Sequence, residues 1–271
     1  MTLGNKILLV GATDTGRVRE HNEDMIALEP DIGLLVLADG MGGYNAGEVA
    51  SGIAVKTVVN LVRESVERED LAGADPVSGL SRRSIVLRDA IQRANKIIYH
   101  TARTQPQCEG MGTTIVSALF HDNRVTVAHV GDSRLYRWRK GELKQLTRDH
   151  SVLQEQIDSG IITPEQARQS RNRNLLTRAL GADPVVDADI ADHPVMVGDV
   201  YLLCSDGLHD MLEDGEIAAT LAGPAEKLDS CAARLVQSAN DHGGRDNVSV
   251  VLVRVRQAFP ARQSWWARFL A

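Results

Sequence analysis

A continuous apolar run at residues 32–38 ends abruptly in Asp39, and a glycine-rich turn at residues 40–43 follows it. A run without alternation of apolar and polar residues is typical of a strand that is buried on both faces. A carboxylate at the end of such a strand is costly unless a cation or hydrogen-bond donors meet it. Asp-Gly is also a common hairpin turn, but a helical pattern rather than a second strand comes next. The stretch therefore predicts a buried strand that ends in a carboxylate in need of a partner.

Three further aspartates lie beside apolar runs of the same kind. Asp206 follows one run, Asp132 follows another after a single glycine, and Asp246 lies two residues before the last. If these strands share one sheet edge or the rim of one sandwich, their carboxylates converge. Converging carboxylates favour hard cations with oxygen ligands, such as Mg²⁺ or Mn²⁺.

The bulk composition limits the class of protein. A chain of 271 residues with 43% hydrophobic residues can bury a large core. It has no linker-like segment, so we expect one domain. A net charge of −6 argues against nucleic-acid binding.

The three cysteines match neither a disulfide framework nor a zinc motif. The only N-terminal apolar run, residues 7–10, is too short for a signal peptide or a membrane span. We therefore expect a cytoplasmic protein.

Periodicity places the elements in order. Short strands are predicted at residues 7–12 and 25–28, and amphipathic helices at 46–62 and around 87–98. The period then changes to two, which predicts an antiparallel meander. Its four strands are residues 113–120, 124–130, 134–139 and 142–146. The C-terminal part is predicted to form a strand before Asp206, helices near 214–221 and 225–239, and a last strand at 248–253.

A basic insertion at residues 147–178 interrupts this pattern. A short helix is predicted at 152–159, and Thr163-Pro164 is typical of a helix start. The arginines of the insertion are Arg168, Arg171, Arg173 and Arg178. Such a segment suits a lid over an acidic site or a solvated face equally well.

Six motifs together point to a known family. They are Arg19-x-x-x-Glu23-Asp24, Asp39-Gly40-Met41-Gly42-Gly43, Gly112-Thr113-Thr114, Gly131-Asp132-Ser133-Arg134, Ser205-Asp206-Gly207-Leu208 and Gly244-Arg245-Asp246-Asn247. These motifs occur in the order that is typical of one family, and through them the chain resembles the bacterial metal-dependent, type-2C protein serine/threonine phosphatases over nearly its whole length.

The resemblance implies an α+β fold, a four-layer α-β-β-α sandwich with two central antiparallel sheets flanked by helix pairs. It also implies one catalytic domain at residues 1–256, with the insertion at 147–178 as the family's flap. Residues 257–271, which contain Trp265 and Trp266, form a short C-terminal tail.

The resemblance further implies a site for two ions of Mn²⁺ or Mg²⁺. Asp39 bridges both ions, and the Gly40 carbonyl adds an oxygen ligand. Asp206 and Asp246 complete the protein ligands of the first ion, and Glu23 serves the second.

Three more residues have implied roles. Asp132 helps to hold a third, weaker ion, Arg19 grips the substrate phosphate, and Asp24 supports the network of metal-bound water. Two ions about 3.5–4 Å apart lower the pKa of a shared water and supply hydroxide near neutral pH. That hydroxide attacks phosphorus in line, while the ions and Arg19 stabilise the oxygen charge. Catalytic roles thus fall to Arg19, Asp24 and Asp39.

One position departs from the family pattern. Eukaryotic relatives place a histidine directly after the Asp-Gly pair, whereas Met41 is found here and has no proton to donate. A metal-bound water or the nearby His21 are the alternatives for the leaving-group acid.

The implied substrates are phosphorylated proteins, with a serine/threonine kinase and its substrates as partners and a monomer as the acting form. Two alternatives are a catalytically inactive relative that binds phosphoproteins, and a metal enzyme for a small phosphate ester or a phosphorylated anti-sigma antagonist. No metal carboxylate is missing, which argues against the first alternative, and a basic flap favours a protein substrate over a small one.

Overall fold

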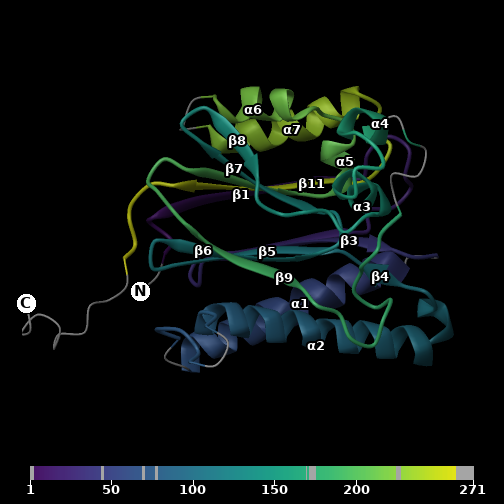
Figure 1. Ribbon diagram of the computed structural model, residues 1–271, viewed down its shortest axis with the longest axis horizontal. Helices are drawn as coiled ribbons and strands as arrows, with labels where there is room; N and C mark the ends of the chain where they lie inside the picture. Colours follow the sequence, from purple (N-terminus) through teal and green to yellow (C-terminus); the bar gives the residue numbers. More distant parts are fainter. Residues whose placement is uncertain are drawn as a thin grey trace, which may run out of the picture.

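The chain folds into four layers, in which two β-sheets pack face to face and helices cover both outer faces (Figure 1). The computed structural model describes residues 3–43, 46–68, 71–76, 79–168, 170, 175–223 and 227–260. Within these residues the predicted α-β-β-α sandwich is confirmed.

One sheet has five strands in the order β1-β11-β10-β7-β8, and all its pairs are antiparallel. Its strands are β1 (Ile7–Asp14), β11 (Val248–Val255), β10 (Val200–Cys204), β7 (Arg134–Arg139) and β8 (Glu142–Gln145). The helices α6 (Asp214–Leu221) and α7 (Leu228–Asp241) cover its outer face.

The other sheet has the order β2-β3-β5-β6-β9, with β4 paired to the end of β3. Its strands are β2 (Asp24–Glu29), β3 (Leu34–Met41), β4 (Gly112–Thr113), β5 (Ile115–His121), β6 (Arg124–Val130) and β9 (Asp189–Pro194). The long helices α1 (Ala46–Arg68) and α2 (Arg82–Thr104) cover its outer face, and a 3₁₀ turn, η1 (Pro106–Cys108), follows α2.

Strand β3 shows why the run before Asp39 has no polar residues. Leu34, Val36 and Ala38 pack into the core beneath α1 and α2. Leu35 and Leu37 point the other way, into the core between the two sheets. Successive side chains of a strand point to opposite faces, so a strand covered on both sides is apolar throughout.

The predicted four-strand meander is wrong at its centre. β5 pairs with β6 in the six-stranded sheet, whereas β7 pairs with β8 in the five-stranded sheet. The chain changes sheets at Gly131, which has φ +102°, a conformation that glycine adopts readily. Alternation of apolar and polar residues predicts a strand but does not identify the strand with which it pairs. The change of sheet therefore could not be predicted from the alternation.

Strand β9 was not predicted. Its sequence, Asp-Ile-Ala-Asp-His-Pro, has one β-branched residue, Ile190, among two aspartates and a proline that are rare in strands, and it lies at the edge of its sheet. Pairing with β6 fixes it, with Ala128 opposite Ile190.

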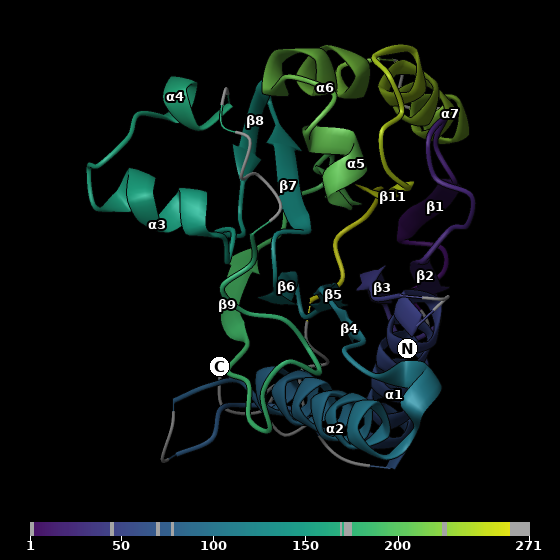
Figure 2. The same cartoon turned by 90° about the vertical axis from the view of Figure 1, so that its right-hand side faces the viewer.

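The insertion carries two of the predicted helices, α3 (Val152–Asp158) and α4 (Pro164–Arg168), which project from the sandwich beside β7 and β8 (Figure 2). Ser151 caps α3 by accepting a hydrogen bond from the Gln154 N–H at 3.2 Å. Arg171, Arg173, Trp265 and Trp266 lie outside the described residues, as does the side chain of Arg168.

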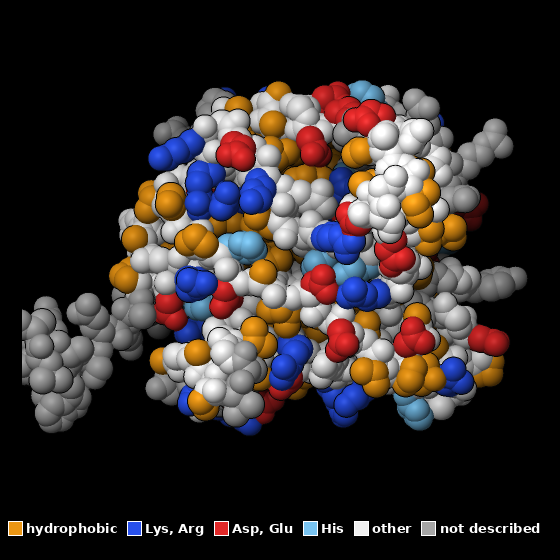
Figure 3. Space-filling model, viewed as in Figure 1, with side chains coloured by type: hydrophobic (Ala, Val, Ile, Leu, Met, Phe, Trp, Pro, Cys, Tyr) orange, Lys and Arg blue, Asp and Glu red, His pale blue; other side chains and the backbone are white. Residues whose placement is uncertain are grey.

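Acidic and basic side chains are interspersed over the face shown in Figure 3, with a group of Lys and Arg over β7 and β8. None of the helices among the described residues is both long enough and apolar enough to cross a membrane.

Candidate active site

The predicted carboxylates gather in a cleft of about 210 Å³ at one end of the sandwich. Its lining is Arg19, Glu23, Asp39, Gly40, Met41, Gly42, Thr114, Asp132, Leu176, Asp206 and Asp246. Seven of the eight predicted site residues are in this set, and the eighth, Asp24, lies behind Asp39. The carboxylates come from both sheets, because each one lies at a strand end on the same side of the molecule.

Asp39 lies near the end of β3, where its backbone is held on both sides. Asp24 of β2 is its cross-strand neighbour. The Asp39 N–H donates to Thr114 Oγ1 at 3.1 Å, and Thr113 Oγ1 donates to the Asp39 carbonyl at 2.8 Å. The Thr114 hydroxyl in turn lies 2.7 Å from that of Ser133. The threonines of the Gly-Thr-Thr motif therefore fix the end of β3.

Glu23 faces the start of α1. Its N–H donates to Asn247 Oδ1 at 2.8 Å, and its carbonyl accepts from Ser51 Oγ at 2.6 Å. Two glycines permit this close approach: a Cβ on Gly40 would lie 2.2 Å from the Gly47 carbonyl oxygen, and one on Gly47 would lie 2.7 Å from the Glu23 carboxylate.

Asp206 and Asp246 come from the five-stranded sheet. Asp206 is the first residue of the short helix α5 (Asp206–His209) after β10, and Asp246 comes just before β11. Arg19 Nη2 donates to Asp246 Oδ2 at 2.6 Å. About half of the Arg19 side chain is exposed, so its guanidinium remains accessible from the cleft.

Asp132 lies at the corner where the chain passes from one sheet to the other. Its carbonyl is 3.2 Å from Nε2 of His209. Burial lowers the pKa of His209 to about 3, so this ring is neutral and its N–H donates to the carbonyl.

Mutual repulsion in the cleft opposes ionisation of the carboxylates. Burial raises the pKa of Asp39 well above its usual range, and the charges of Asp24 and Asp206 raise it further. Burial and Asp132 act in the same direction on the pKa of Asp206. Burial, followed by the charge of Asp149, raises the pKa of Asp132 to about 7. Without a cation, these groups are therefore held partly protonated near neutral pH.

The donor set fits hard divalent cations. Oδ1 of Asp206 and Oδ1 of Asp24 are both buried and, among the described residues, have no hydrogen-bond partner. A buried carboxylate oxygen without a partner is costly, and a cation beside Asp206 removes that cost while it offsets the repulsion. The cleft offers carboxylate and carbonyl oxygens and neither thiolate nor imidazole, which is the ligand set of Mg²⁺ and Mn²⁺.

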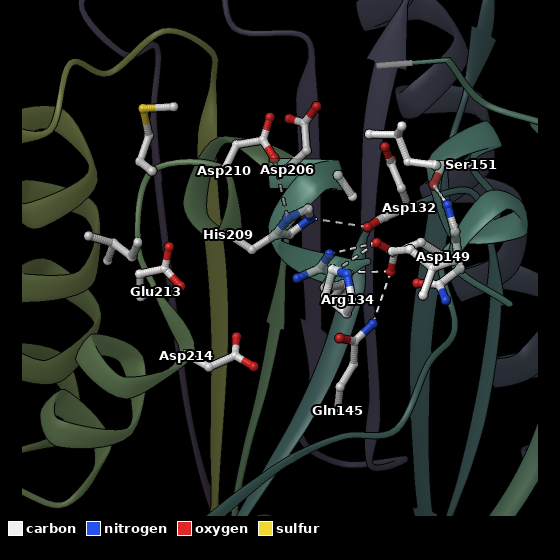
Figure 4. A pocket seen from close by; sticks show the side chains of 17 residues that line it. Asp132, Arg134, Gln145, Asp149, Ser151, Asp206, His209, Asp210, Glu213 and Asp214 are labelled. Atoms are coloured by element: carbon white, nitrogen blue, oxygen red, sulfur yellow. Dashed lines mark hydrogen bonds and ion pairs between the residues drawn. The ribbon is translucent and has the colours of Figure 1, made fainter. Parts of the chain in front are cut away.

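A larger hollow of about 510 Å³ adjoins the cleft and shares Asp132 and Asp206 with it. It lies between the insertion helices and the α5–α6 segment, and Figure 4 shows its polar wall. On that wall Arg134 binds Asp149 through two nitrogens, at 3.0 and 2.7 Å, and donates to Tyr136 at 2.9 Å. The hollow extends the cleft beneath the insertion.

Sequence reasoning missed several residues that hold the site together. Asn247 donates to the carbonyls of Thr15 and His21, both at 2.9 Å, in addition to its bond with Glu23. Ser205 Oγ donates to Asp24 Oδ2 at 2.8 Å. Both residues are inside the quoted motifs, so the signal was present without an assigned role.

Met41 and His21 are the two residues considered above for the acid that protonates the leaving group. Of these two, only Met41 lines the cleft. The His21 side chain is exposed and is not part of the lining.

Comparison with known proteins agrees with this geometry. The family model described as Protein phosphatase 2C matches residues 16–252. The chain is 37% identical over 244 residues to the serine/threonine phosphatase Stp of Listeria monocytogenes, covering 89% of this chain and 93% of that protein. It is 39% identical over 243 residues to the serine/threonine protein phosphatase PstP of Mycobacterium tuberculosis, covering 90% of this chain and 44% of that longer protein.

Solved structures give the same result. The crystal structure of M. tuberculosis PstP superposes with a TM-score of 0.81 at 38% identity, covering 93% of this chain and all of that one. The PstP catalytic domain in complex with two manganese ions has a TM-score of 0.78 at 38% identity, covering 93% and 99%. Stp1 of Staphylococcus aureus has a TM-score of 0.82 at 35% identity, covering 95% and 98%. The chain described here belongs to the protein phosphatase 2C family.

Proposed function

We propose that this protein is a metal-dependent phosphatase that hydrolyses phosphoserine and phosphothreonine in other proteins. The observation that carries the proposal is the cleft itself, in which carboxylates from five separate segments converge beside an accessible arginine. Family membership and relatives named serine/threonine phosphatases support it.

The residues that would hold the cations follow from the positions of the oxygens. Asp39 and Gly40 both line the cleft, and the Asp39 carboxylate, with the Gly40 carbonyl, would be shared between two ions of Mn²⁺ or Mg²⁺. Asp206 and Asp246 approach from the five-stranded sheet, and Glu23 from the side of α1. The relative that contains two manganese ions supports a pair of ions.

Asp132 is proposed to hold a third, weaker ion together with Asp206. Both residues line the cleft and also the adjoining hollow, which supports a position for such an ion on the side of the insertion.

When bound, divalent cations supply Lewis acidity and lower the pKa of water enough for nucleophilic attack near neutral pH. The protein contributes binding and orientation. Arg19 projects into the cleft with five N–H donors, and its planar fork matches two oxygens of a phosphate. Arg19 therefore binds the phosphate and stabilises the negative charge on its oxygens.

Asp24 acts from behind the cleft. Ser205 donates to one of its oxygens, and burial, together with the charge of Asp246, raises its pKa to about 6. It is proposed to orient water through its second oxygen, Oδ1, which has no partner among the described residues.

The shape of the site favours a protein substrate. The small cleft opens into the larger hollow beneath the insertion, which gives room for residues flanking a phosphorylated side chain. We further propose that a serine/threonine kinase is the opposing enzyme, that nucleic acid is not a partner, and that the protein acts as a monomer. A cytoplasmic location is consistent with the three cysteines, which are free and buried.

For the domain organisation we propose one catalytic unit at residues 1–256, with the flap at 147–178 and a tail at 257–271. The interleaved order of the strands supports this proposal, because β1 near the N-terminus pairs with β11 near the C-terminal end.

The decisive experiment measures hydrolysis of a phosphothreonine peptide with Mn²⁺, without metal and with EDTA. Turnover that requires Mn²⁺ and stops with EDTA is the expected result. Folded, Mn²⁺-loaded protein without turnover would contradict the proposal and would favour a phosphoprotein-binding module. A preference for small phosphate esters over phosphopeptides, by kcat/KM, would leave the reaction class intact and overturn the substrate.

A further inference from the structure

His150 lies near the start of the flap, where it contacts the loop that carries Asp132. Its backbone N–H donates to the Gly131 carbonyl at 3.0 Å, and its carbonyl accepts from the Thr177 N–H at 2.9 Å. Thr177 belongs to the returning end of the flap, one residue after Leu176, which lines the catalytic cleft. The buried residue His150 thus contacts both the loop that carries Asp132 and the returning end of the flap.

The imidazole of His150 adds a second bond to the same glycine. The Gly131 N–H donates to Nδ1 of His150 at 3.1 Å. Together with the backbone bond, His150 therefore holds both the N–H and the carbonyl of Gly131. This glycine has φ +102°, and it precedes Asp132 directly. Rotation of its backbone would move the Asp132 carboxylate, so the two bonds fix the position of that carboxylate.

The bond to Nδ1 determines the protonation state of the ring. Burial lowers the pKa of His150, and the charges of His129 and Arg178 lower it further. The ring is therefore neutral, and because Nδ1 accepts a hydrogen bond, the proton is on Nε2. Nε2 lies 3.4 Å from Asp189 Oδ2, and Arg178 Nη1 donates to Asp189 Oδ1 at 2.8 Å.

This tautomer decides between two interpretations of the cluster. His129, His150 and Asp189 lie close enough together to hold a metal ion. A metal on Nε2 of His150 would move the proton to Nδ1, where it would face the Gly131 N–H. The second ring is also engaged, because Nε2 of His129 lies 2.8 Å from the Arg148 carbonyl oxygen. The two rings stack at 4.7 Å between centroids. The cluster therefore fits a rigid support rather than a metal site.

We propose that His150 is a positioning residue for the metal centre: it holds the Gly131–Asp132 corner so that the carboxylate points into the cleft, and it couples the flap to that carboxylate. The path runs from Arg178 at the end of the flap through Asp189 to His150 and Gly131. This inference rests on the proposed role of Asp132 as a cation ligand. It implies that a phosphoprotein that moves the flap also changes the affinity of the weakest cation.

The first test compares two substitutions of His150, one that preserves a hydrogen-bonding atom at the position of Nδ1 and one that preserves such an atom near Nε2. In His150→Asn, the amide oxygen occupies the position of Nδ1 and can accept from the Gly131 N–H. His150→Gln places its amide near Nε2 and leaves that N–H without its acceptor. His193→Asn, on the same edge strand as Asp189, is the matched control. Mn²⁺ binding is measured by the electron paramagnetic resonance signal of free Mn²⁺, and folding by thermal denaturation.

The expected result is that His150→Gln weakens the loosest Mn²⁺ site about 10-fold or more, as removal of a residue that orients a metal ligand commonly does. His150→Asn and His193→Asn should remain within about 3-fold of the unsubstituted protein. Equal affinities for the Asn and Gln variants would overturn the positioning role. So would a loosest site unchanged in both.

The second test uses Asp189→Asn, which alters a half-exposed side chain away from the cleft and does not depend on the folding of the His150 variants. It should lower kcat/KM for a phosphorylated protein several-fold more than kcat/KM for p-nitrophenyl phosphate, because only the protein engages the flap. Equal losses on both substrates would overturn the coupling. Absence of turnover in the unsubstituted protein would instead contradict the proposed function, and the Mn²⁺ titration would still test His150.

Discussion

Asp24 and Asp39 are directly opposite each other in the β2–β3 ladder, so two acidic side chains occupy neighbouring positions, with Asp39 lining the cleft and Asp24 next to it. Like charges opposite each other destabilise a sheet. The structure retains the pair because the residues around it supply donors, notably Ser205, and because the cleft is built to accept cations.

The stability of the metal-free protein should therefore fall as pH rises. The pKa values of Asp24, about 6, and Asp132, about 7, lie above the value of about 3.9 for an unfolded aspartate. The folded state thus binds more protons than the unfolded state from about pH 4 to pH 7, and its stability is lost across that window. Buried histidines such as His209, whose pKa is lowered, act in the opposite direction below about pH 6.5. We therefore expect a lower Tm in EDTA at pH 8 than at pH 6.5.

The same reasoning predicts that Mn²⁺ raises the Tm more at pH 8 than at pH 6.5, because protons compete with the cation at the lower pH. Differential scanning calorimetry at both pH values, with and without Mn²⁺, checks this. A Tm of the EDTA-treated protein that rises with pH would contradict the repulsion between carboxylates. Asp39→Asn should flatten the dependence.

Asp39→Asn should abolish turnover and leave the fold intact. The substitution removes the carboxylate proposed to serve two cations at once, and we expect a loss of kcat greater than about 100-fold, since even residues that only orient metal ligands cost 10- to 100-fold. Phosphopeptide hydrolysis at saturating Mn²⁺ measures the effect, and circular dichroism checks the fold. Full activity would rule out the bridging role.

Asp132→Asn should act more weakly and in a different way. It should raise the Mn²⁺ concentration needed for half-maximal activity, with a smaller effect at saturating Mn²⁺, because Asp132 lies at the outer side of the cleft toward the hollow. A Mn²⁺ titration of activity gives the result. Unchanged Mn²⁺ dependence would argue against a third ion.

Arg19→Ala should raise the KM for a phosphopeptide about 10-fold, since a hydrogen bond to a charged group contributes about 1.5–3 kcal/mol. Inhibition by inorganic phosphate should weaken in parallel. Arg19→Lys keeps the charge without the planar fork and should restore only part of the affinity. If phosphate inhibits the alanine variant as well as the unsubstituted protein, Arg19 does not bind the phosphate.

Gly40→Ala should disrupt the metal loop. Its Cβ would lie 2.2 Å from the Gly47 carbonyl oxygen, a backbone atom at the start of α1, so the helix or the loop must shift. We expect lower Tm and loss of Mn²⁺ binding. Gly43→Ala is the matched control, because its Cβ would meet nothing within 4 Å. Equal behaviour of the two variants would show that close packing of β3 on α1 is not required.

The sequence predicted the strands and helices well where the apolar pattern was strong. The run before Asp39 and the helix α1 are examples, because burial on one or both faces leaves a direct trace in residue type. It failed where the determinant was a pairing partner. The change of sheet at Gly131 and the edge strand β9 depend on which strands pair with each other, and the residue pattern of one sequence does not identify pairing partners.

The same division holds for the site. Carboxylates at strand ends were recognisable individually, and the order of six motifs linked them to a family. Thr114, Asn247 and Ser205 act through hydrogen bonds to the backbone or to a neighbouring carboxylate. Nothing in the spacing of these residues indicates their partners, which come from segments up to 232 residues away in the chain.

The origin of the carboxylates in both sheets has a mechanical consequence. Asp39 belongs to one sheet, whereas Asp206 and Asp246 adjoin strands of the other. Apolar contacts between the sheets, such as Phe120 against Tyr201 at 5.2 Å between ring centroids, fix the position of one sheet relative to the other. The spacing of the carboxylates is therefore governed by packing in the middle of the sandwich. Substitutions there, remote from any ligand, would retune which cation radius the cleft accommodates.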